Sequence, residues 1–290
     1  MNYFTEILSF QHRLHIPFND HRLLITAFAH PSFIADLEDV DSLSVEQDKD
    51  LRRRMKIRKT LSKSMTYPKL SVLGYEKTTL AIKDELYKLY PNITPHICLS
   101  VTDFLMSRET VANVAKNISI ADLLLVSREL DNIEDITSEL HLNFSMDDIL
   151  CDTFYSLVGA IDTDLGEEAS TSFVKDFLVS LIHYEDLDLH VNMENPKDQL
   201  SQILQLNRLS PDLIELRTIA ETGVAAESPV YYIGVYYNSV KIGHGVYHTV
   251  PQAREQALKN TVYACLEGDV DLRQFKNVND DISDEVSSTC

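Results

Sequence analysis

The sequence predicts a two-domain protein of the α plus α/β class, with an all-helical domain first and a smaller domain of α-β-β-β-α order second. Two observations support this fold class. Residues 1–185 repeat apolar side chains at helical spacing and interrupt them with prolines. Val230–Tyr237 is a run of β-branched and aromatic residues, which favours a strand. A length of 290 residues suffices for two cores.

Composition narrows the function classes. The net charge of −19 argues against a general nucleic-acid binder, because phosphate neutralisation needs a basic surface. No run approaches the roughly 18 apolar residues of a membrane helix, so we expect no membrane span. Four cysteines are scattered without a Cys-x-x-Cys pair, which favours neither structural disulfides nor a cysteine zinc site. They are Cys98, Cys151, Cys265 and Cys290.

The first domain is expected to begin with a core helix. Residues 1–19 lack the Arg and Ser enrichment of an amphipathic transit peptide, so we expect any presequence to have been removed ahead of them. Four further helices are predicted over residues 22–33 (stopping at Pro31), 80–90, 104–117 and 173–182. Among the histidines, His30 favours a capping or core role. His12 and His15 share a helical face, but no third metal ligand accompanies them.

A charged insertion near residues 36–66 separates the early helices from the rest of this domain. It starts acidic, from Asp36 to Asp50, and then turns basic. Two interpretations of the basic run stay open: contact with phosphate, or a solvated helix face neutralised by the preceding acids. We expect its arginines on the surface. The candidate RNA-contact residues here are Arg52, Arg53, Arg54, Lys56, Arg58 and Lys59.

The second domain is predicted over residues 195–268, after a linker at 186–194 and before an acidic tail at 269–290. A helix over 196–205 precedes the strand at 230–237. Asn238-Ser239 forms a plausible turn into a strand at 241–247, and a helix closes the domain at 253–265. The tyrosines of the first of these strands favour packing within the sheet over stacking on bases. They are Tyr231, Tyr232, Tyr236 and Tyr237.

Two segments of the first domain resemble the motifs of the RNase III family. Tyr67–Lys77 matches the frame Glu-x-Leu-Glu-Phe-Leu-Gly-Asp-Ala at Leu70, Leu73 and Gly74, and residues 151–160 match Ala-Asp-x-x-Glu-Ala-Leu-Ile-Gly-Ala. The resemblance implies that Ser71, Tyr75, Asp152 and Tyr155 stand where active members carry metal-binding acids. One carboxylate of four survives, Asp152, and we expect it to be a buried remnant hydrogen-bonded to its neighbours. We therefore expect no catalytic residues, no metal, no cofactor and no nuclease activity.

The second domain resembles double-stranded-RNA-binding domains through Pro-Lys-x-x-Leu-x-Gln at 196–202 and Gly-x-Gly at 243–245. The family's lysine cluster keeps only one cation here, and its Gly-Pro-x-His loop, which would fall near Val224–Glu227, is not matched. The resemblance leaves four RNA-contact candidates, Lys197, Gln202, His244 and Arg254. With so few cations, we expect weak duplex binding with a shallow salt dependence.

Both domains together resemble the RNase III-like proteins of the mitochondrial large ribosomal subunit. That resemblance implies a structural protein of the mitochondrial matrix, with ribosomal RNA and other mitochondrial ribosomal proteins as partners. Two alternatives stay open. One is an active ribonuclease III-type endoribonuclease acting on double-stranded RNA with unorthodox ligands. The other is an inactive partner that forms an RNase III-type dimer with an active homologue.

Overall fold

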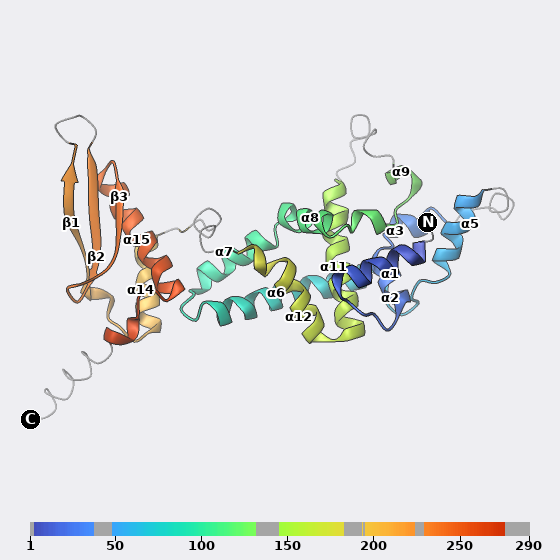
Figure 1. Cartoon of the computed structure of the whole chain (residues 1–290), viewed down its shortest axis with the longest axis horizontal. Coiled ribbons are helices and arrows are strands. Elements are labelled where there is room, and N and C mark those ends of the chain that lie inside the picture. The colour runs from blue at the N-terminus through green and yellow to red at the C-terminus, as the bar shows by residue number, and fades with distance from the viewer. Residues whose placement is uncertain are drawn as a thin grey trace, which may run out of the picture. The chain divides into compact units, whose positions relative to one another are not determined.

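The computed structural model describes residues 3–37, 48–131, 145–182, 193, 195–223 and 229–275. Within these ranges the chain is mostly helical, with one three-stranded antiparallel sheet (Figure 1). This confirms the predicted fold class. Most of the acidic block, most of the predicted linker, the loop Val224–Glu227 and the tail beyond Phe275 lie outside the described residues.

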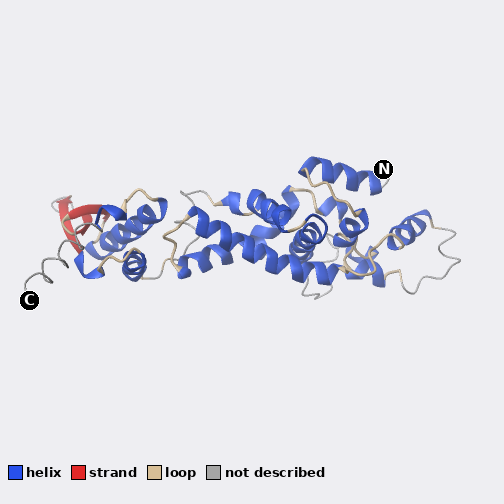
Figure 2. Ribbon diagram, turned by 90° about the horizontal axis from the view of Figure 1, so that it is seen from below, coloured by secondary structure: helices blue, strands red, loops and turns tan. Residues whose placement is uncertain are grey.

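The chain divides into two compact units. Unit 1 comprises Met1–Glu85 and Thr102–His183, and unit 2 comprises Leu86–Val101 and Tyr184–Cys290. In Figure 2 the red strands all belong to unit 2, and the described elements of unit 1 are helical.

Unit 1 opens with three helices, α1 (Tyr3–Leu14), α2 (His21–Ala27) and α3 (Pro31–Ala35). Helix α1 buries Tyr3, Ile7 and Phe10, as expected of a core helix. The single helix predicted over 22–33 is wrong, because α2 ends at Ala27. Pro31 starts α3 instead of stopping a helix, since its missing N–H is no loss in a first turn.

The segment from residue 67 to residue 117, which passes through both units, also differs from the sequence prediction. The helix predicted over 80–90 is the second half of a longer helix, α6 (Tyr67–Leu89), which also contains the first motif segment. The helix predicted over 104–117 is two, α7 (Pro95–Leu105) and α8 (Arg108–Asn117). The break has a local cause, because the Ser107 hydroxyl accepts the Thr110 N–H and caps α8.

Helix α11 (Met146–Leu165) is the centre of unit 1. Its residues from Ile149 to Ile161 are buried except Asp152, and it packs against α2, α8 and α12 (Glu167–Phe177). A capping box starts this helix. The Ser145 side chain accepts backbone N–H groups of the first turn, and the Asp148 carboxylate accepts the Ser145 N–H. The shorter elements of unit 1 are α5 (Lys49–Arg58), η1 (Ala121–Leu123), α9 (Arg128–Asp131) and η2 (Val179–Leu181).

Unit 2 has the predicted α-β-β-β-α order. Its elements are α14 (Pro196–Leu206), η4 (Pro211–Leu213), β1 (Ile214–Thr222), β2 (Val230–Tyr237), β3 (Val240–Tyr247), α15 (Val250–Glu267) and η6 (Leu272–Phe275). The strands pair antiparallel in the order β1-β2-β3. Asn238 and Ser239 form the expected turn, both with positive φ. Helix α15 packs on β2 and β3, and α14 packs on α15.

Gly243 and Gly245 explain why α15 lies so close to β3. A Cβ at Gly245 would lie 2.3 Å from the backbone nitrogen of Ala257, and one at Gly243 would lie 2.0 Å from Thr261 Oγ1. Only glycine allows this approach. The glycine pair that carries the family resemblance therefore has a packing role.

Candidate functional site

Helices α6 and α11 cross with their backbones in contact at Gly74 and Gly159. A Cβ at Gly74 would lie 1.8 Å from the carbonyl oxygen of Tyr155, and one at Gly159 would lie 2.2 Å from the carbonyl oxygen of Leu70. The two glycines thus bring the two motif segments together, although they lie far apart in the sequence.

At this crossing the structure brings together Tyr75 and Tyr155, two of the four positions that the resemblance aligns with the metal-binding acids of the RNase III family. The rings of Tyr75 and Tyr155 meet edge to face, with centroids 5.2 Å apart. Tyr155 is buried, and its hydroxyl donates to the carbonyl oxygen of Met106 at 3.4 Å. Tyr75 remains 48% exposed. Ser71 lies one turn earlier on α6 and is half-buried.

Asp152 occupies the fourth position. We expected it to be a buried remnant, and this is wrong: Asp152 is exposed. Partial desolvation by its surroundings raises the pKa of its carboxyl, Asp148 raises it further, and Arg108 lowers it. Arg108 instead forms an ion pair with Asp148, one turn before Asp152 on α11.

Proton affinities at the crossing reflect burial. Burial raises the pKa of the Cys151 thiol to about 11, against a lowering hydrogen bond with Tyr155. Burial also raises the pKa of the Tyr155 hydroxyl, with added contributions from Cys151, Tyr75 and Asp152. Both groups are therefore neutral at physiological pH, so neither supplies an anionic ligand.

These residues do not fit the divalent ion that RNase III chemistry uses. Magnesium prefers several carboxylate or other hard oxygen ligands in octahedral geometry. Here two aromatic rings pack against each other at the acid positions, and a guanidinium neutralises Asp148. Nor does the described part of the chain group three His, Cys, Asp or Glu side chains as metal ligands elsewhere.

Arg108 and Asp148 were not identified from the sequence. Part of the signal was present, because Ser145-x-x-Asp148 has the spacing of a capping box and marks the start of α11. The ion pair itself joins residues 40 positions apart (148 − 108), which no local pattern predicts.

The basic run forms helix α5, and the structure corrects its interpretation. Arg54 is not on the surface: it is 8% exposed, pairs with Asp36 at 3.2 Å, and its guanidinium lies 4.8 Å over the Phe33 ring. It also donates to the carbonyl oxygen of Val126. Arg58 donates to the carbonyl oxygen of Leu37 at 2.6 Å and is half-buried.

The apolar residues of this run form no clean stripe in the sequence, which disfavours burial, yet in the structure they pack against the core. Leu51 joins a core cluster with Ala29, Phe33 and Leu37, and Met55 and Ile57 pack against it. The exposed cations of the run are therefore Arg52, Arg53, Lys56 and Lys59. Of these, Arg53 lies 3.9 Å from Glu6.

In unit 2 the four RNA-contact candidates, Lys197, Gln202, His244 and Arg254, are all exposed. They do not form one surface. Lys197 and Gln202 lie on α14 and Arg254 on α15, whereas His244 lies on the face of β3 that points away from the helices.

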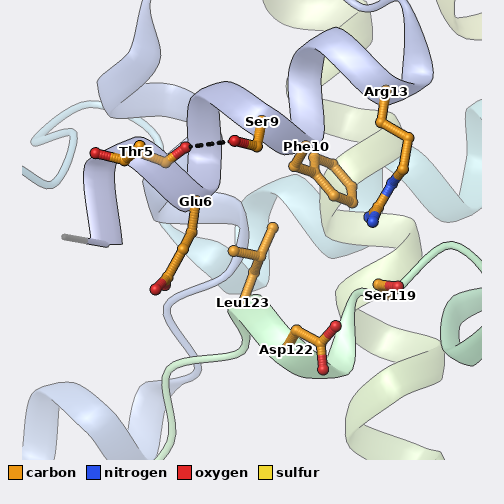
Figure 3. Close-up of a pocket in the computed structure, with 8 residues that line it drawn as sticks. All are labelled: Thr5, Glu6, Ser9, Phe10, Arg13, Ser119, Asp122 and Leu123. Carbon is orange, nitrogen blue, oxygen red and sulfur yellow. Dashed lines mark hydrogen bonds between the residues drawn. The ribbon is translucent and has the colours of Figure 1, made fainter. Parts of the chain in front are cut away.

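A cavity of about 370 Å³ lies between α1 and η1 (Figure 3). It is lined by Thr5, Glu6, Ser9, Phe10, Arg13, Ser119, Asp122 and Leu123. Arg13 donates to the carbonyl oxygen of Ile118 at 2.9 Å, which fixes it at the rim. None of these residues belongs to the two RNase III motifs, so the cavity is separate from the α6–α11 crossing.

One of the histidines singled out in the sequence, His30, has a structural role. His30 is the N-cap of α3, where its Nδ1 accepts the Ser32 N–H at 3.2 Å, which confirms the capping role. Desolvation lowers its pKa. His12 and His15 lie with ring centroids 6.3 Å apart. None of the helices in the described ranges has the length and apolar character of a membrane span.

Together, the helical order and the glycine crossing define an RNase III-like domain. Residues 2–161 match the family model described as the endonuclease domain of the large ribosomal subunit protein mL44. The chain belongs to this family, whose members are mitochondrial ribosomal proteins with an RNase III-like domain.

The chain is also similar to proteins described as ribonuclease 3 or ribonuclease III. Ribonuclease 3 of Desulforamulus reducens is 29% identical over 200 residues, covering 69% of this chain and 76% of its own. Ribonuclease 3 of Chlamydia muridarum is 22% identical over 263 residues, covering 89% and 95%. The nuclease domain of ribonuclease III from Campylobacter jejuni aligns with a TM-score of 0.43 and 19% identity, covering 59% of this chain and 94% of that one.

Proposed function

We propose that this protein is a structural constituent of the mitochondrial large ribosomal subunit, in the matrix, and has no ribonuclease activity of its own. The observation that carries the proposal is the pair Tyr75–Tyr155, whose rings pack together at two acid positions within a domain of the mL44 family. A domain that has the RNase III fold without the carboxylate ligands for metal ions is expected to act through binding, not through catalysis.

Cleavage assays test the loss of activity. The full chain, incubated with duplex RNA and either magnesium or manganese, should produce no specific products. Cleavage that disappears in Asp152→Ala would show that the one remaining acid still supports catalysis, and the proposal would be wrong. Sedimentation tests the proposed ribosomal role, because the tagged protein should sediment together with large ribosomal subunits.

Within the subunit, the exposed cations of α5 are our proposed contact with ribosomal RNA. Arg52, Arg53, Lys56 and Lys59 point outward from a helix whose other side is fixed to the core by Leu51 and Arg54. A rigid helix presenting several cations can position a protein on phosphates without reading sequence.

Charge reversal tests this contact, and the burial of Arg54 decides the design. Arg52→Glu with Lys56→Glu should keep the fold and reduce incorporation into the large subunit. Arg54 must stay unchanged, because its reversal would bury an unpaired acid beside Asp36. Normal incorporation of the double variant would show that docking relies on other surfaces.

A second candidate is an inactive subunit of an RNase III-type dimer, which an active homologue would complete. One observation favours it: Val72 is 69% exposed and Tyr75 is 48% exposed on the same stretch of α6, beside the crossing. Large apolar side chains exposed together often mark an interface. A stable dimer of the purified chain, abolished by Val72→Glu, would support this candidate, and a monomer at high concentration would count against self-pairing.

A further inference from the structure

The outer face of the sheet in unit 2 carries an aromatic surface that the family resemblance does not use. Strand register places Tyr232, Gly234 and Tyr236 of β2 on the face opposite α15, because Ile233, Val235 and Tyr237 are buried. Arg217 of β1 pairs with Gly234 on this face, as does His244 of β3.

Gly234 is what makes this surface flat. A Cβ there would lie 2.8 Å from both Ile219 Cδ1 and Tyr236 Cε2, so these two side chains lie down over the glycine. Ile219 is 44% exposed, and Val246, opposite Tyr232 on β3, is 46% exposed. The centre of the face is therefore a low apolar platform.

Cations surround the platform. The Arg217 guanidinium lies 4.8 Å from the Tyr236 ring centroid, and Lys241 Nζ lies 5.2 Å from that of Tyr232 and donates to its hydroxyl at 3.0 Å. The His244 ring lies 5.2 Å from the Tyr232 ring. Among the described residues of this face one carboxylate is present, Glu215, which accepts from Arg217 at 2.8 Å and 2.5 Å.

We infer that this outer face, built on Tyr232 and Tyr236, binds unpaired nucleotides of RNA. Tyrosine rings on an open sheet offer stacking surfaces to bases, and adjacent Arg and Lys side chains pair with the phosphates between them. Duplex RNA does not fit, because its bases are already stacked inside the helix and it is recognised by shape. The local charge also differs from the −19 of the whole chain, with two cations against one carboxylate.

The helical side of unit 2 is less suited to RNA. Lys197 is followed by Asp198, and Arg254 by Glu255, which also pairs with Lys259 at 2.9 Å. Each cation there has an acidic neighbour. On the sheet face, by contrast, Lys241 donates to a tyrosine hydroxyl and two tyrosine rings are open to stacking, so this face offers the better nucleic-acid surface in unit 2.

This inference names the RNA class within the proposed ribosomal role and rests on that role for its setting. The test uses the purified full chain, so the two can fail separately. The probe is an oligouridylate of about 12 nucleotides, within the ~4–16 nucleotide range of single-strand sites. Since the chain contains no tryptophan, Tyr236→Trp introduces a single reporter whose emission should be quenched when a base stacks on it.

Alanine variants locate the site. Tyr232→Ala and Tyr236→Ala should each weaken oligouridylate binding at least about fivefold, given the usual loss per stacked base. Tyr236→Phe should bind like the wild type, because it keeps the ring. Tyr247→Ala is the matched control, an exposed tyrosine on the opposite face of the same sheet, and should change nothing. Thermal melting confirms that each variant is folded.

Four results would overturn the inference. The first is a wild-type chain that does not bind the single strand. The second is binding that the tyrosine variants leave unchanged. The third is stronger binding of a duplex longer than about 16 base pairs, lost on Lys197→Ala or Arg254→Ala, which would place RNA on the helical side. Crosslinks from this face to protein alone in assembled subunits would identify a protein partner instead. Absence of the wild-type chain from large subunits would count only against the ribosomal role.

Discussion

The glycine crossing of α6 and α11 matches the RNase III motifs at Gly74 and Gly159, whereas Tyr75 and Tyr155 beside it depart from them. At the crossing, any side chain larger than hydrogen collides with backbone, 1.8 Å from one carbonyl oxygen and 2.2 Å from another. At the acid positions, by contrast, Tyr75 and Tyr155 fill the space with an edge-to-face contact worth about 0.5–1.5 kcal/mol.

The difference teaches which constraint belongs to the fold. Backbone contact between two helices admits no substitute for glycine, so it persists as long as the fold does. Carboxylates gathered around an ion repel one another when the ion is absent, so their replacement by aromatic rings removes a cost. The same two helices can therefore lose their chemistry and keep their packing.

The largest expected effect comes from disturbing the crossing. Gly74→Ala should lower the free energy of unfolding by about 3 kcal/mol or more, because the new methyl meets the Tyr155 backbone and the helices must separate. Urea unfolding of the full chain, followed by circular dichroism, measures it. Glu76→Ala, at an exposed position on the same helix, is the control and should stay within about 0.5 kcal/mol. Equal stability of the two variants would mean that the helices are not in backbone contact.

A smaller effect is expected from restoring one acid. Tyr155→Glu should cost about 2–3 kcal/mol, because it removes a buried ring and places a carboxylate near Asp152. Magnesium should not restore this loss, since Tyr75 and Ser71 remain. The triple variant Ser71→Glu, Tyr75→Asp, Tyr155→Glu should instead melt at higher temperature with magnesium. If the wild-type chain itself is stabilised by magnesium, the crossing can hold an ion as it stands.

Whether the sequence predicts a structural feature depends on how far apart the interacting residues lie in the chain. The crossing could be anticipated, since Gly74 and Leu70 fit a known motif, and so could the second domain, whose strands and turn are local patterns. Helix α5 shows the limit. Leu51, Arg54, Met55 and Arg58 share one face at helical spacing, but two of them are arginines, so the stripe does not read as apolar.

Those arginines are buried for reasons that lie elsewhere in the chain. The partners of Arg54 include the Val126 carbonyl oxygen, 72 residues away, and that of Arg58 is the Leu37 carbonyl oxygen. Long stems let both residues cover apolar surface while their guanidinium groups reach these acceptors. A sequence pattern does not show which acceptors, backbone or side-chain, a fold brings close to an arginine. The Arg108–Asp148 ion pair was missed for this reason.

A third prediction concerns His30, the N-cap of α3, whose ring packs against Tyr67, the first residue of α6. The His30 ring lies 5.5 Å from Tyr67, and its pKa is lowered by desolvation. Its folded-state pKa therefore lies below the unfolded value of about 6.5, so stability is full above that pH and falls as pH drops towards the folded value. His30→Asn keeps a cap acceptor without titrating. The wild type should lose up to about 1 kcal/mol relative to this variant between neutral and mildly acidic pH. Parallel pH profiles would show that His30 does not sense protonation.

The smallest effect is expected from the remaining acid. Because the pKa of Asp152 is raised in the folded state, the ionised carboxylate is less favourable there than in the unfolded chain. Its contribution to stability should thus decline as pH rises from the unfolded value of about 3.9 through the raised folded value. Asp152→Asn should then be slightly more stable than the wild type at neutral pH and equal to it in acid, with a small difference because the side chain is exposed.

Asp148→Asn is the control and should be less stable than the wild type at neutral pH, since it loses the Arg108 ion pair and weakens the start of α11. Melting temperatures of the three proteins across pH decide it. A destabilising Asp152→Asn would mean that this acid still holds a partner, and the chemical half of the crossing would then be less completely lost than its tyrosines indicate.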